Sequence, residues 1–235
     1  MLEFYRPKHK NRKVFSWLLS KQVWGFKTKT MRLLRNTFIY ILFTLFTNGL
    51  FAQLVTDYYW NNAKKFEGEF SNGLKQGLHT WWYGNGQIEV QLYYTDDYPD
   101  GKISGWYKNG QLKYTGYYVA GVKHGKWLFW YKNGKPQQMQ YFVNDVPDDY
   151  WYIWYDNGKL KEKSYYVGGM LEGKWESWHK NGNKWEEGYC KQGLKDGLWT
   201  EWYLNGNKKM EVTYRKGIMV TLPKRWWSNG GIDTQ

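Results

Sequence analysis

The chain has 235 residues, of which 21% are aromatic, with 17 Trp, 22 Tyr and 26 Gly, and this composition indicates a thin, turn-rich fold instead of an ordinary aliphatic core. The formal net charge is +13, but ten of the 34 Lys and Arg lie in residues 1–52 beside a single acid, which leaves 24 basic against 20 acidic residues beyond them. A nucleic-acid-binding surface concentrates positive charge in the folded part of a protein, so we expect no nucleic-acid partner.

Residues 1–30 are basic and carry no turn or repeat pattern. We interpret them as an extension in front of the true start at Met31, that is, as a gene-start artefact. The alternative is a cytoplasmic tail that keeps its positive charge inside, in front of an uncleaved membrane anchor.

Residues 31–52 have the order of parts expected of a signal peptide. A basic segment from Met31 to Arg35 precedes an apolar stretch from Thr37 to Ala52, which ends on a small residue where a signal peptidase cuts. The strongly apolar part spans only about ten residues, against roughly twenty in a transmembrane helix. We therefore expect an apolar helical signal segment, cleaved after Ala52, and a protein exported to the periplasm, the cell envelope or the medium. The alternative is a membrane-anchored protein whose signal is not cleaved.

We interpret residues 53–235 as one domain of about eight units with a 24-residue period. The register is set by an Asn that recurs at intervals of 23 and then 24 residues: Asn62, Asn85, Asn109, Asn133, Asn157, Asn181, Asn205 and Asn229. Ala63 follows the first Asn, and a Gly follows each of the others: Gly86, Gly110, Gly134, Gly158, Gly182, Gly206 and Gly230. This regularity predicts a tandem-repeat fold.

Two columns of Trp keep the same register. Tyr59 stands three residues before the first Asn, and the equivalent residues form the Trp82 column: Trp82, Trp106, Trp130, Trp154, Trp178, Trp202 and Trp226. Six residues before the Asn, four consecutive units carry the Trp127 column: Trp127, Trp151, Trp175 and Trp199. Because the two columns are an odd number of residues apart, we expect them on opposite faces of a strand unless a bulge intervenes.

Each unit is predicted to be a β-hairpin. An Asn-Gly pair between aromatic runs is the strongest short signal for a two-residue type I′ turn, in which both central residues take a positive φ. In the unit of Asn133, the strand before the turn is expected at about Lys126 to Tyr131. The strand after a turn is expected, in the preceding unit, at about Gln111 to Tyr118, and a linker that ends at Gly125 then reverses the chain.

Stacked hairpins predict an all-β fold, an elongated single-layer antiparallel sheet of about fifteen or sixteen strands, roughly 70 Å long and twisted along its length. Equivalent residues of successive units then lie in ladders. We expect the rings of the Trp82 column to pack on one another as a continuous ribbon.

Residues 117–134 (YYVAGVKHGKWLFWYKNG) and 165–182 (YYVGGMLEGKWESWHKNG) resemble the MORN-variant repeat, the second MORN type, and the segment from Gly121 to Gly125 resembles its Gly-x-x-His-Gly step. The resemblance extends from about Tyr58 to the carboxyl terminus. It implies a hairpin-repeat fold and a binding role, and it supplies no catalytic residue. Such chains are grouped with the YwqK-like family of antitoxins, which implies a toxin as the partner. Since an antitoxin normally meets its toxin in the cytoplasm, this role fits an export signal only if the toxin lies in the envelope.

Few residues outside the aromatic columns carry chemistry. His79, His124 and His179 occupy different columns, and because the period brings no carboxylate or Cys together with them, we interpret them as structural. Cys190 stands where other units have an aromatic residue, and we expect it to pack as a small apolar side chain. We therefore expect no catalytic residue, no metal ligand and no cofactor.

Two linkers are rich in acidic residues: Asp96, Asp97, Asp100, Asp145, Asp148 and Asp149. They are two units apart, roughly 19 Å, which is too far to share one ion. Turn chemistry explains them, and the alternative is weak calcium binding within a single linker.

The aromatic columns either only hold the sheet together or leave part of a ribbon exposed for binding. We expect a non-catalytic scaffold that binds another protein along an aromatic and charged face. The alternative is a module that binds an envelope glycan or a lipid headgroup through exposed rings. An exposed Trp82 column would favour the glycan, and a column covered by its neighbours would disfavour it.

Overall fold

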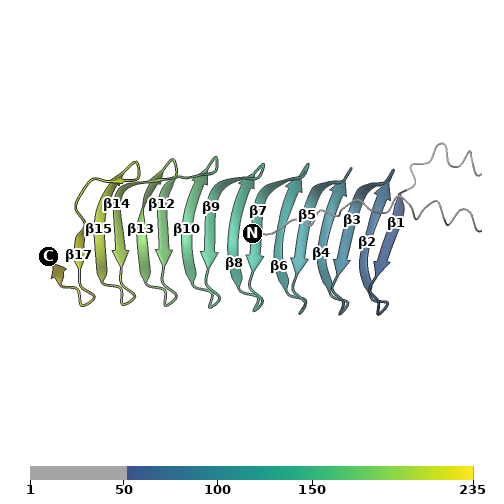
Figure 1. Cartoon of the computed structure of the whole chain (residues 1–235), viewed down its shortest axis with the longest axis horizontal. Helices are drawn as coiled ribbons and strands as arrows, with labels where there is room; N and C mark the ends of the chain where they lie inside the picture. Colours follow the sequence, from purple (N-terminus) through teal and green to yellow (C-terminus); the bar gives the residue numbers. More distant parts are fainter. Residues whose placement is uncertain (1–51, 235) are drawn as a thin grey trace, which may run out of the picture. The chain divides into compact units, whose positions relative to one another are not determined.

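The computed structural model describes residues 52–234, which form one open antiparallel sheet of 18 strands (Figure 1). The expected all-β hairpin-repeat sheet is therefore confirmed. In this part of the chain no helix is long and apolar enough to span a membrane. The predicted extension of residues 1–30 and all but Ala52 of the predicted signal peptide lie outside the described residues, so the proposed helix and its cleavage stay predictions.

Each strand pairs with strands that are close to it in the sequence. The strands are β1 (Gln53–Tyr58), β2 (Lys64–Ser71), β3 (Leu74–Trp82), β4 (Ile88–Thr95), β5 (Tyr98–Trp106), β6 (Leu112–Val119), β7 (Val122–Trp130), β8 (Pro136–Val143), β9 (Val146–Trp154), β10 (Leu160–Val167), β11 (Met170–Leu171), β12 (Gly173–Trp178), β13 (Lys184–Lys191), β14 (Leu194–Trp202), β15 (Lys208–Arg215), β16 (Ile218–Met219), β17 (Lys224–Trp226) and β18 (Ile232–Asp233). In each unit, the strand before the Asn-Gly loop is called the unit-opening strand. The sheet has more strands than the expected fifteen or sixteen because two unit-opening strands are interrupted, one as β11 and β12 and one as β16 and β17.

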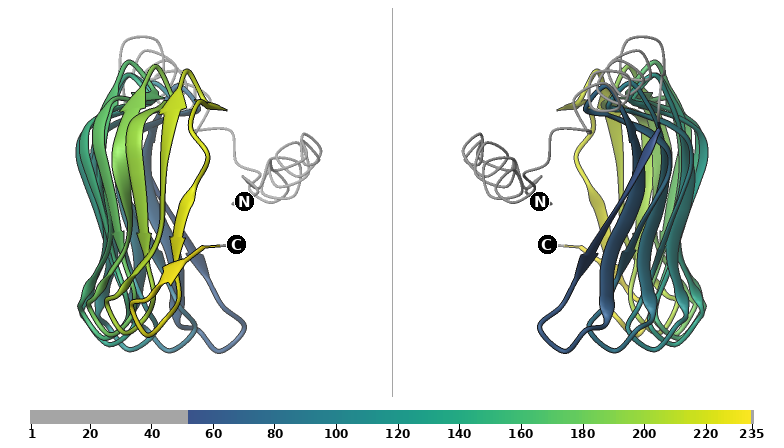
Figure 2. Two further views of the ribbon diagram at one scale, coloured as in Figure 1. Left: turned by 90° about the vertical axis from the view of Figure 1, so that its left-hand side faces the viewer. Right: turned by 90° about the vertical axis from the view of Figure 1, so that its right-hand side faces the viewer.

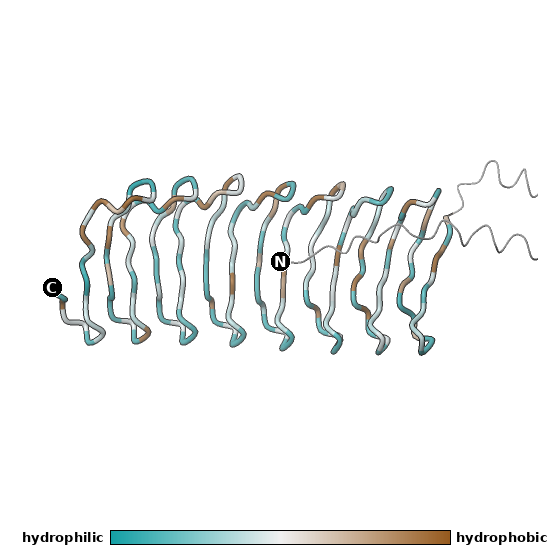
Figure 3. The backbone as a smooth tube through the Cα atoms, in the orientation of Figure 1, coloured by the Kyte–Doolittle hydropathy of each residue, from teal (hydrophilic) through white to brown (hydrophobic). Residues whose placement is uncertain are grey.

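The sheet is a single bowed layer (Figure 2), so each face can be buried only by its own side chains. On one face, which we call the packed face, Leu92, Ile103, Trp127 and Phe142 form a buried cluster. A second cluster on that face surrounds Trp199. The other face, the open face, carries more exposed side chains. Hydrophobic and hydrophilic residues accordingly mix along the strands (Figure 3), as expected when successive residues point to opposite faces.

The Asn-Gly loops are not type I′ turns. In the loop after β7, the Gly134 amide donates to the Tyr131 carbonyl at 2.9 Å, and the Tyr131 amide donates to the Lys135 carbonyl at 2.9 Å. Gly134 has a φ of 80°, whereas Asn133 does not take a positive φ. This is a type I turn followed by a left-handed Gly, which makes a three-residue loop with a bulge. The same two bonds recur around Gly86, Gly110, Gly158, Gly182, Gly206 and Gly230.

The first loop corrects the register of the repeat. Asn62 has a φ of 62°, and its amide donates to the Tyr59 carbonyl at 3.0 Å. Asn62 therefore takes the place that Gly has in later loops, and Asn61 takes the place of the recurring Asn, so the period is 24 residues from the start. The residue equivalent to Trp82 is consequently Tyr58, not Tyr59.

Type I′ turns lie instead at the opposite ends of the strands, between units. In the turn that joins β6 to β7, Ala120 and Gly121 have φ values of 47° and 88°, and the flanking Val119 and Val122 are paired. The predicted linker is therefore much shorter than expected. Gly125, with a φ of 69°, does not end a linker but lies within β7.

The unit-opening strands are longer than predicted for this reason. β7 begins at Val122 instead of Lys126 and contains a bulge, which shows as a shift of register between Thr115 and Tyr117 on the neighbouring strand. The second strand of the hairpin agrees with the prediction to within one residue at each end, since β6 spans Leu112–Val119.

Candidate binding face

The two Trp columns lie on opposite faces, as predicted. Trp154, in the Trp82 column, stacks on Tyr152 of the open face with ring centroids 5.7 Å apart. Trp151, in the Trp127 column, instead contacts Tyr166 at 4.7 Å and Phe142 at 5.3 Å, and Phe142 belongs to the packed face.

The Trp82 column is not a continuous ribbon of rings, so that prediction is wrong. Within residues 52–234 no two of its indoles are in ring contact, although the strand spacing itself permits contact between successive units, as at Trp175 and Trp199. The space between them is filled by other side chains. The Lys184 ammonium lies 4.6 Å from the centre of the Trp178 ring, and Pro136 is paired with Trp130 across their hairpin. All seven Trp of the column are half-buried.

The Trp127 column belongs to the interior of the packed face. Trp127 and Trp199 are only 3% and 4% exposed, while Trp151 and Trp175 are half-buried. The Trp175 and Trp199 rings stack at 5.5 Å. These side chains hold neighbouring units together and offer little surface to a partner.

A further column of side chains forms hydrogen bonds between successive loops, and it was not predicted from the sequence. The Tyr131 hydroxyl donates to the Trp154 carbonyl, 23 residues further on, at 2.7 Å. Equivalent bonds come from Tyr59, Tyr83, Tyr107, Tyr155 and Tyr203. His179 takes the same place, with its Nε2 3.1 Å from the Trp202 carbonyl oxygen. The signal was available, because an aromatic residue follows each Trp of the Trp82 column in the sequence.

The Asn of each loop has a second structural task. The Asn133 amide Nδ2 donates to the Asp156 carbonyl of the next loop at 2.9 Å, and its Oδ1 accepts from the Lys135 amide at 3.0 Å. The recurrence of Asn therefore reflects contacts within and between loops and not the backbone conformation that the type I′ prediction assumed.

Two exposed aromatic residues lie elsewhere on the open face, in what we call the tyrosine–lysine row. Its residues are paired across three hairpins: Lys102 with Tyr117, Lys126 with Tyr141, and Tyr150 with Tyr165. The Tyr117 and Tyr150 side chains are 53% and 44% exposed, and Lys102 and Lys126 are also exposed. This row was not among the predicted binding residues.

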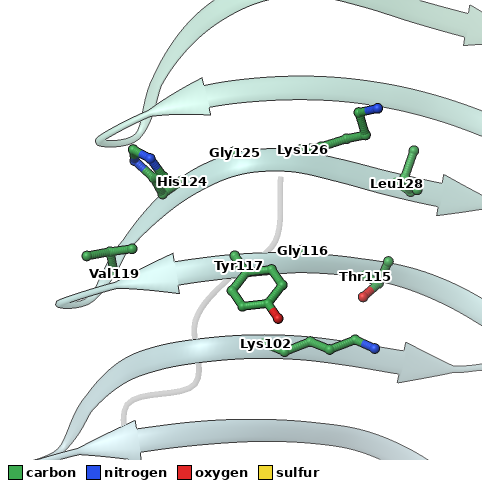
Figure 4. Close-up of a pocket in the computed structure, with 9 residues that line it drawn as sticks. All are labelled: Lys102, Thr115, Gly116, Tyr117, Val119, His124, Gly125, Lys126 and Leu128. Atoms are coloured by element: carbon green, nitrogen blue, oxygen red, sulfur yellow. The ribbon is translucent and has the colours of Figure 1, made fainter.

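Two shallow hollows adjoin this row and share Lys126. The first is lined by Lys102, Tyr117, Lys126 and Leu128 among others (Figure 4). The second, on the neighbouring strands, is lined by Met139, Tyr141, Tyr150 and Tyr152 together with Lys126 and Asp149. The open face thus offers apolar floor, aromatic rings and ammonium groups side by side.

Comparison with protein families identifies the repeat. The model described as the MORN repeat variant matches residues 75–96, 98–120, 123–144, 150–167, 171–191 and 195–216, which together make up more than half of the chain. The chain belongs to the MORN repeat variant family. MORN repeats are generally modules that bind proteins or membranes. A search of curated proteins found no match.

In this MORN-variant sheet the acidic linker residues bond to turns. The Asp145 carboxylate accepts from the Lys123 amide at 2.8 Å, and that of Asp97 accepts from the Lys75 amide at 2.7 Å. Asp100 and Asp148 each accept from a turn amide of the next unit at 3.3 Å. Within residues 52–234 no group of three or more His, Cys, Asp or Glu is placed to hold a metal ion.

Two residues of the MORN-variant units are buried on the packed face. His79 is fully buried in the place that Trp has in the Trp127 column, and its Nε2 lies 2.9 Å from the Glu69 carbonyl oxygen. Burial lowers the pKa of His79. Cys190 packs in the cluster around Trp199, and burial raises the pKa of its thiol. This placement agrees with the interpretation of both as structural residues.

Proposed function

We propose that this MORN-variant chain is a non-catalytic scaffold that binds a protein partner across its open face, along the tyrosine–lysine row. The observation that carries the proposal is the exposure of Tyr117 and Tyr150 beside two hollows that share Lys126. Exposed Tyr over a partly apolar floor is typical of protein interfaces, where aromatic anchors supply much of the binding energy.

The state of the Trp82 column supports a protein partner over a glycan. Stacking on a sugar requires an open ring face, but these indoles are half-buried and some are covered by ammonium groups, as at Trp178 and Trp226. The rings of the tyrosine–lysine row remain open to solvent and would also accept a sugar, so a glycan or lipid headgroup is the alternative to test.

The proposal extends to the setting of the protein. The basic and apolar pattern of residues 31–52 supports export. Resemblance to the YwqK-like family supports an antitoxin role, which in an exported chain requires a toxin located in the envelope. Absence of catalysis is supported by the roles of the candidate groups, because His79 and Cys190 are enclosed in the packed face and the linker carboxylates bond to turn amides.

Site-specific crosslinking in the native host tests the proposal. A photoreactive amino acid is placed at Tyr117, at Tyr150 or, as a control, at Tyr98, which is 63% exposed but lies beside a type I′ turn and outside the row. We expect one protein to be captured from Tyr117 and Tyr150 and not from Tyr98.

Equal capture from all three positions would contradict the proposal. Parallel pull-downs with peptidoglycan and polysaccharide test the alternative: retention that is lost in a folded Tyr117→Ala/Tyr150→Ala variant, without protein capture, would replace the protein partner by a glycan.

A further inference from the structure

The ammonium groups in the middle of the open face have no acidic partner. Lys102 and Lys126 are exposed, and their ammonium groups form no ion pair or hydrogen bond with any residue in the described range 52–234. Lys163, on β10, also lacks an ion pair there and lies over two rings of the same face, 5.0 Å from the centre of Tyr150 and 5.9 Å from that of Tyr152. The only acid that lines either hollow is Asp149.

Further along the same face, the charges are neutralised within the sheet. Lys174, two repeats after Lys126 in the same column, pairs with Glu176 at 2.9 Å and with Glu187 at 3.3 Å. Lys184 pairs with the same two carboxylates at 2.6 and 3.0 Å. The open face is therefore divided into an unneutralised cationic part from β5 to β10 and a self-paired part at β12 and β13.

An apolar strip runs through the cationic part. Leu128, Met139 and Tyr152 are paired in succession on β7, β8 and β9, and each lines one of the two hollows. A ligand that lies across the strands would meet ammonium groups, phenol rings and an apolar floor at once. This combination suits a polypeptide that carries carboxylates better than a small anion.

The spacing of the repeat matches an extended chain that lies across the strands. Lys102 and Lys126 are on β5 and β7, and two strand spacings correspond to about 9.6 Å. Three residues of polyproline II helix rise about 9.3 Å and return to the same side of the chain. An acid at every third residue would therefore meet successive repeats in register.

We propose that the partner contributes an extended acidic segment, which binds across β5 to β10 with its carboxylates at Lys102 and Lys126 and its apolar groups on the strip of Leu128, Met139 and Tyr152. This inference rests on the proposed function and specifies the chemistry of the partner at the same face.

The test uses a synthetic peptide of repeated Glu-Pro-Pro triplets, with a Gln-Pro-Pro peptide as its neutral match, titrated against the full-length chain by fluorescence anisotropy. The acidic peptide should bind at low salt and weaken as the salt concentration rises. The double variant Lys102→Gln/Lys126→Gln should lose affinity by about fivefold or more, while Lys174→Gln, which removes a lysine already paired with two acids, should change affinity by less than about twofold. The variants are exposed substitutions, and circular dichroism checks that they fold.

Equal binding of the Glu and Gln peptides, equal loss in both lysine variants, or no binding of the acidic peptide would overturn the inference. Binding to vesicles with anionic lipid that is stronger than binding to the peptide and is lost in the double variant would also overturn it, in favour of a membrane surface. If Tyr117 still captures a protein in cells while the acidic peptide fails, the proposed function stands and only the acidic segment is wrong.

Discussion

At the scale of single residues, large rings on the packed face are matched by small residues on the neighbouring strand. A Cβ added at Gly116 would lie 2.3 Å from the Trp127 ring, and one added at Gly188 would lie 2.2 Å from the Trp199 ring. These two buried rings thus lie against bare backbone. Glycine at these positions provides space for the ring, a role different from that of the loop glycines, which take a positive φ.

Substitution Gly116→Ala tests this role. The added methyl group overlaps the Trp127 ring, so the free energy of unfolding should fall by about 1–3 kcal/mol. Gly84→Ala is the control, because Gly84 has no atom within 4 Å of the added Cβ and no positive φ. Urea denaturation measures both, and equal stability of the two variants would refute close packing at Gly116.

The buried His79 makes stability depend on pH. Its pKa is lowered by burial from the ordinary value of 6.5, so between the folded-state pKa and 6.5 the unfolded chain binds more protons than the folded chain. The contribution of this group is therefore complete above about pH 6.5 and is lost as the pH falls below it.

Between pH 7 and pH 5, the free energy of unfolding of the His79→Leu variant should fall less than that of the unsubstituted chain. The His124→Gln variant, changed at an exposed position, should show the same fall as the unsubstituted chain. Urea titrations across this pH range provide the measurement. If the unfolding free energy of His79→Leu depends on pH as strongly as that of the unsubstituted chain, His79 is not the source of the pH dependence.

At the scale of the element, each hairpin is closed differently at its two ends. The type I′ turns between units bond to the preceding unit through backbone groups, as when the Gly121 amide donates to the Pro99 carbonyl at 2.7 Å. The three-residue loops bond to the next unit through side chains, with Tyr131 and Asn133 as examples. Both ends of the inner hairpins are thus bonded to a neighbour.

The substitution Tyr131→Phe removes one hydrogen bond between successive loops without removing the aromatic ring. The Trp154 carbonyl loses the hydroxyl donor at 2.7 Å, and the unfolding free energy should fall by about 0.5–1.5 kcal/mol. Tyr117→Phe is the matched control, since that hydroxyl bonds to no residue in the described part of the chain. Thermal unfolding followed by circular dichroism compares them, and the prediction fails if both variants melt together.

At the scale of the whole molecule, the sheet is a row of similar units in which each contacts only its neighbours. Such a fold has no contact that depends on the total number of units, and its stability is approximately a sum over units and interfaces. The two buried clusters, around Trp127 and around Trp199, are separate for the same reason.

Deletion of residues 75–98 removes one period and joins Leu74 to Pro99, which reproduces the junction between Tyr98 and Pro99. We expect the shortened chain to fold, with the dependence of unfolding free energy on urea lowered by about one-eighth. Deletion of residues 75–86 removes half a period and reverses the direction of every later strand relative to the earlier ones. It should prevent the cooperative fold, and a folded half-period variant would contradict the repeat model.

Much of this architecture follows from local chemistry. The alternation of aromatic runs and the recurring Asn-Gly pair predicted the hairpins, and strand parity placed Trp151 and Trp154 on opposite faces. The type I′ turns were predicted at the wrong ends of the strands because Asn-Gly occurs in both kinds of loop. The backbone bonds of Tyr131 and the φ of Asn133 are what distinguish a type I loop with a left-handed Gly from a type I′ turn.

The candidate site depended more on packing. Sequence alone indicated that aromatic residues dominate, and it drew attention to Trp. The exposure of a side chain, however, depends on which side chains lie beside it. Lys and aliphatic side chains of adjacent strands cover the Trp82 column, while Tyr117 and Tyr150 remain exposed. Lys174 meets Glu176 on its own strand and Glu187 on the neighbouring strand, whereas Lys126 meets no acid within residues 52–234.

The sequence by itself therefore determined the period, the all-β class and the single-layer stacking, because hairpin formation and repeat register depend on residues that are close along the chain. Tertiary structure alone decided which rings are buried, which lysines are neutralised and which face is open. These properties depend on contacts between side chains of neighbouring strands and hairpins, such as Glu176 with Lys184 and Trp175 with Trp199, which come together only when the sheet has formed.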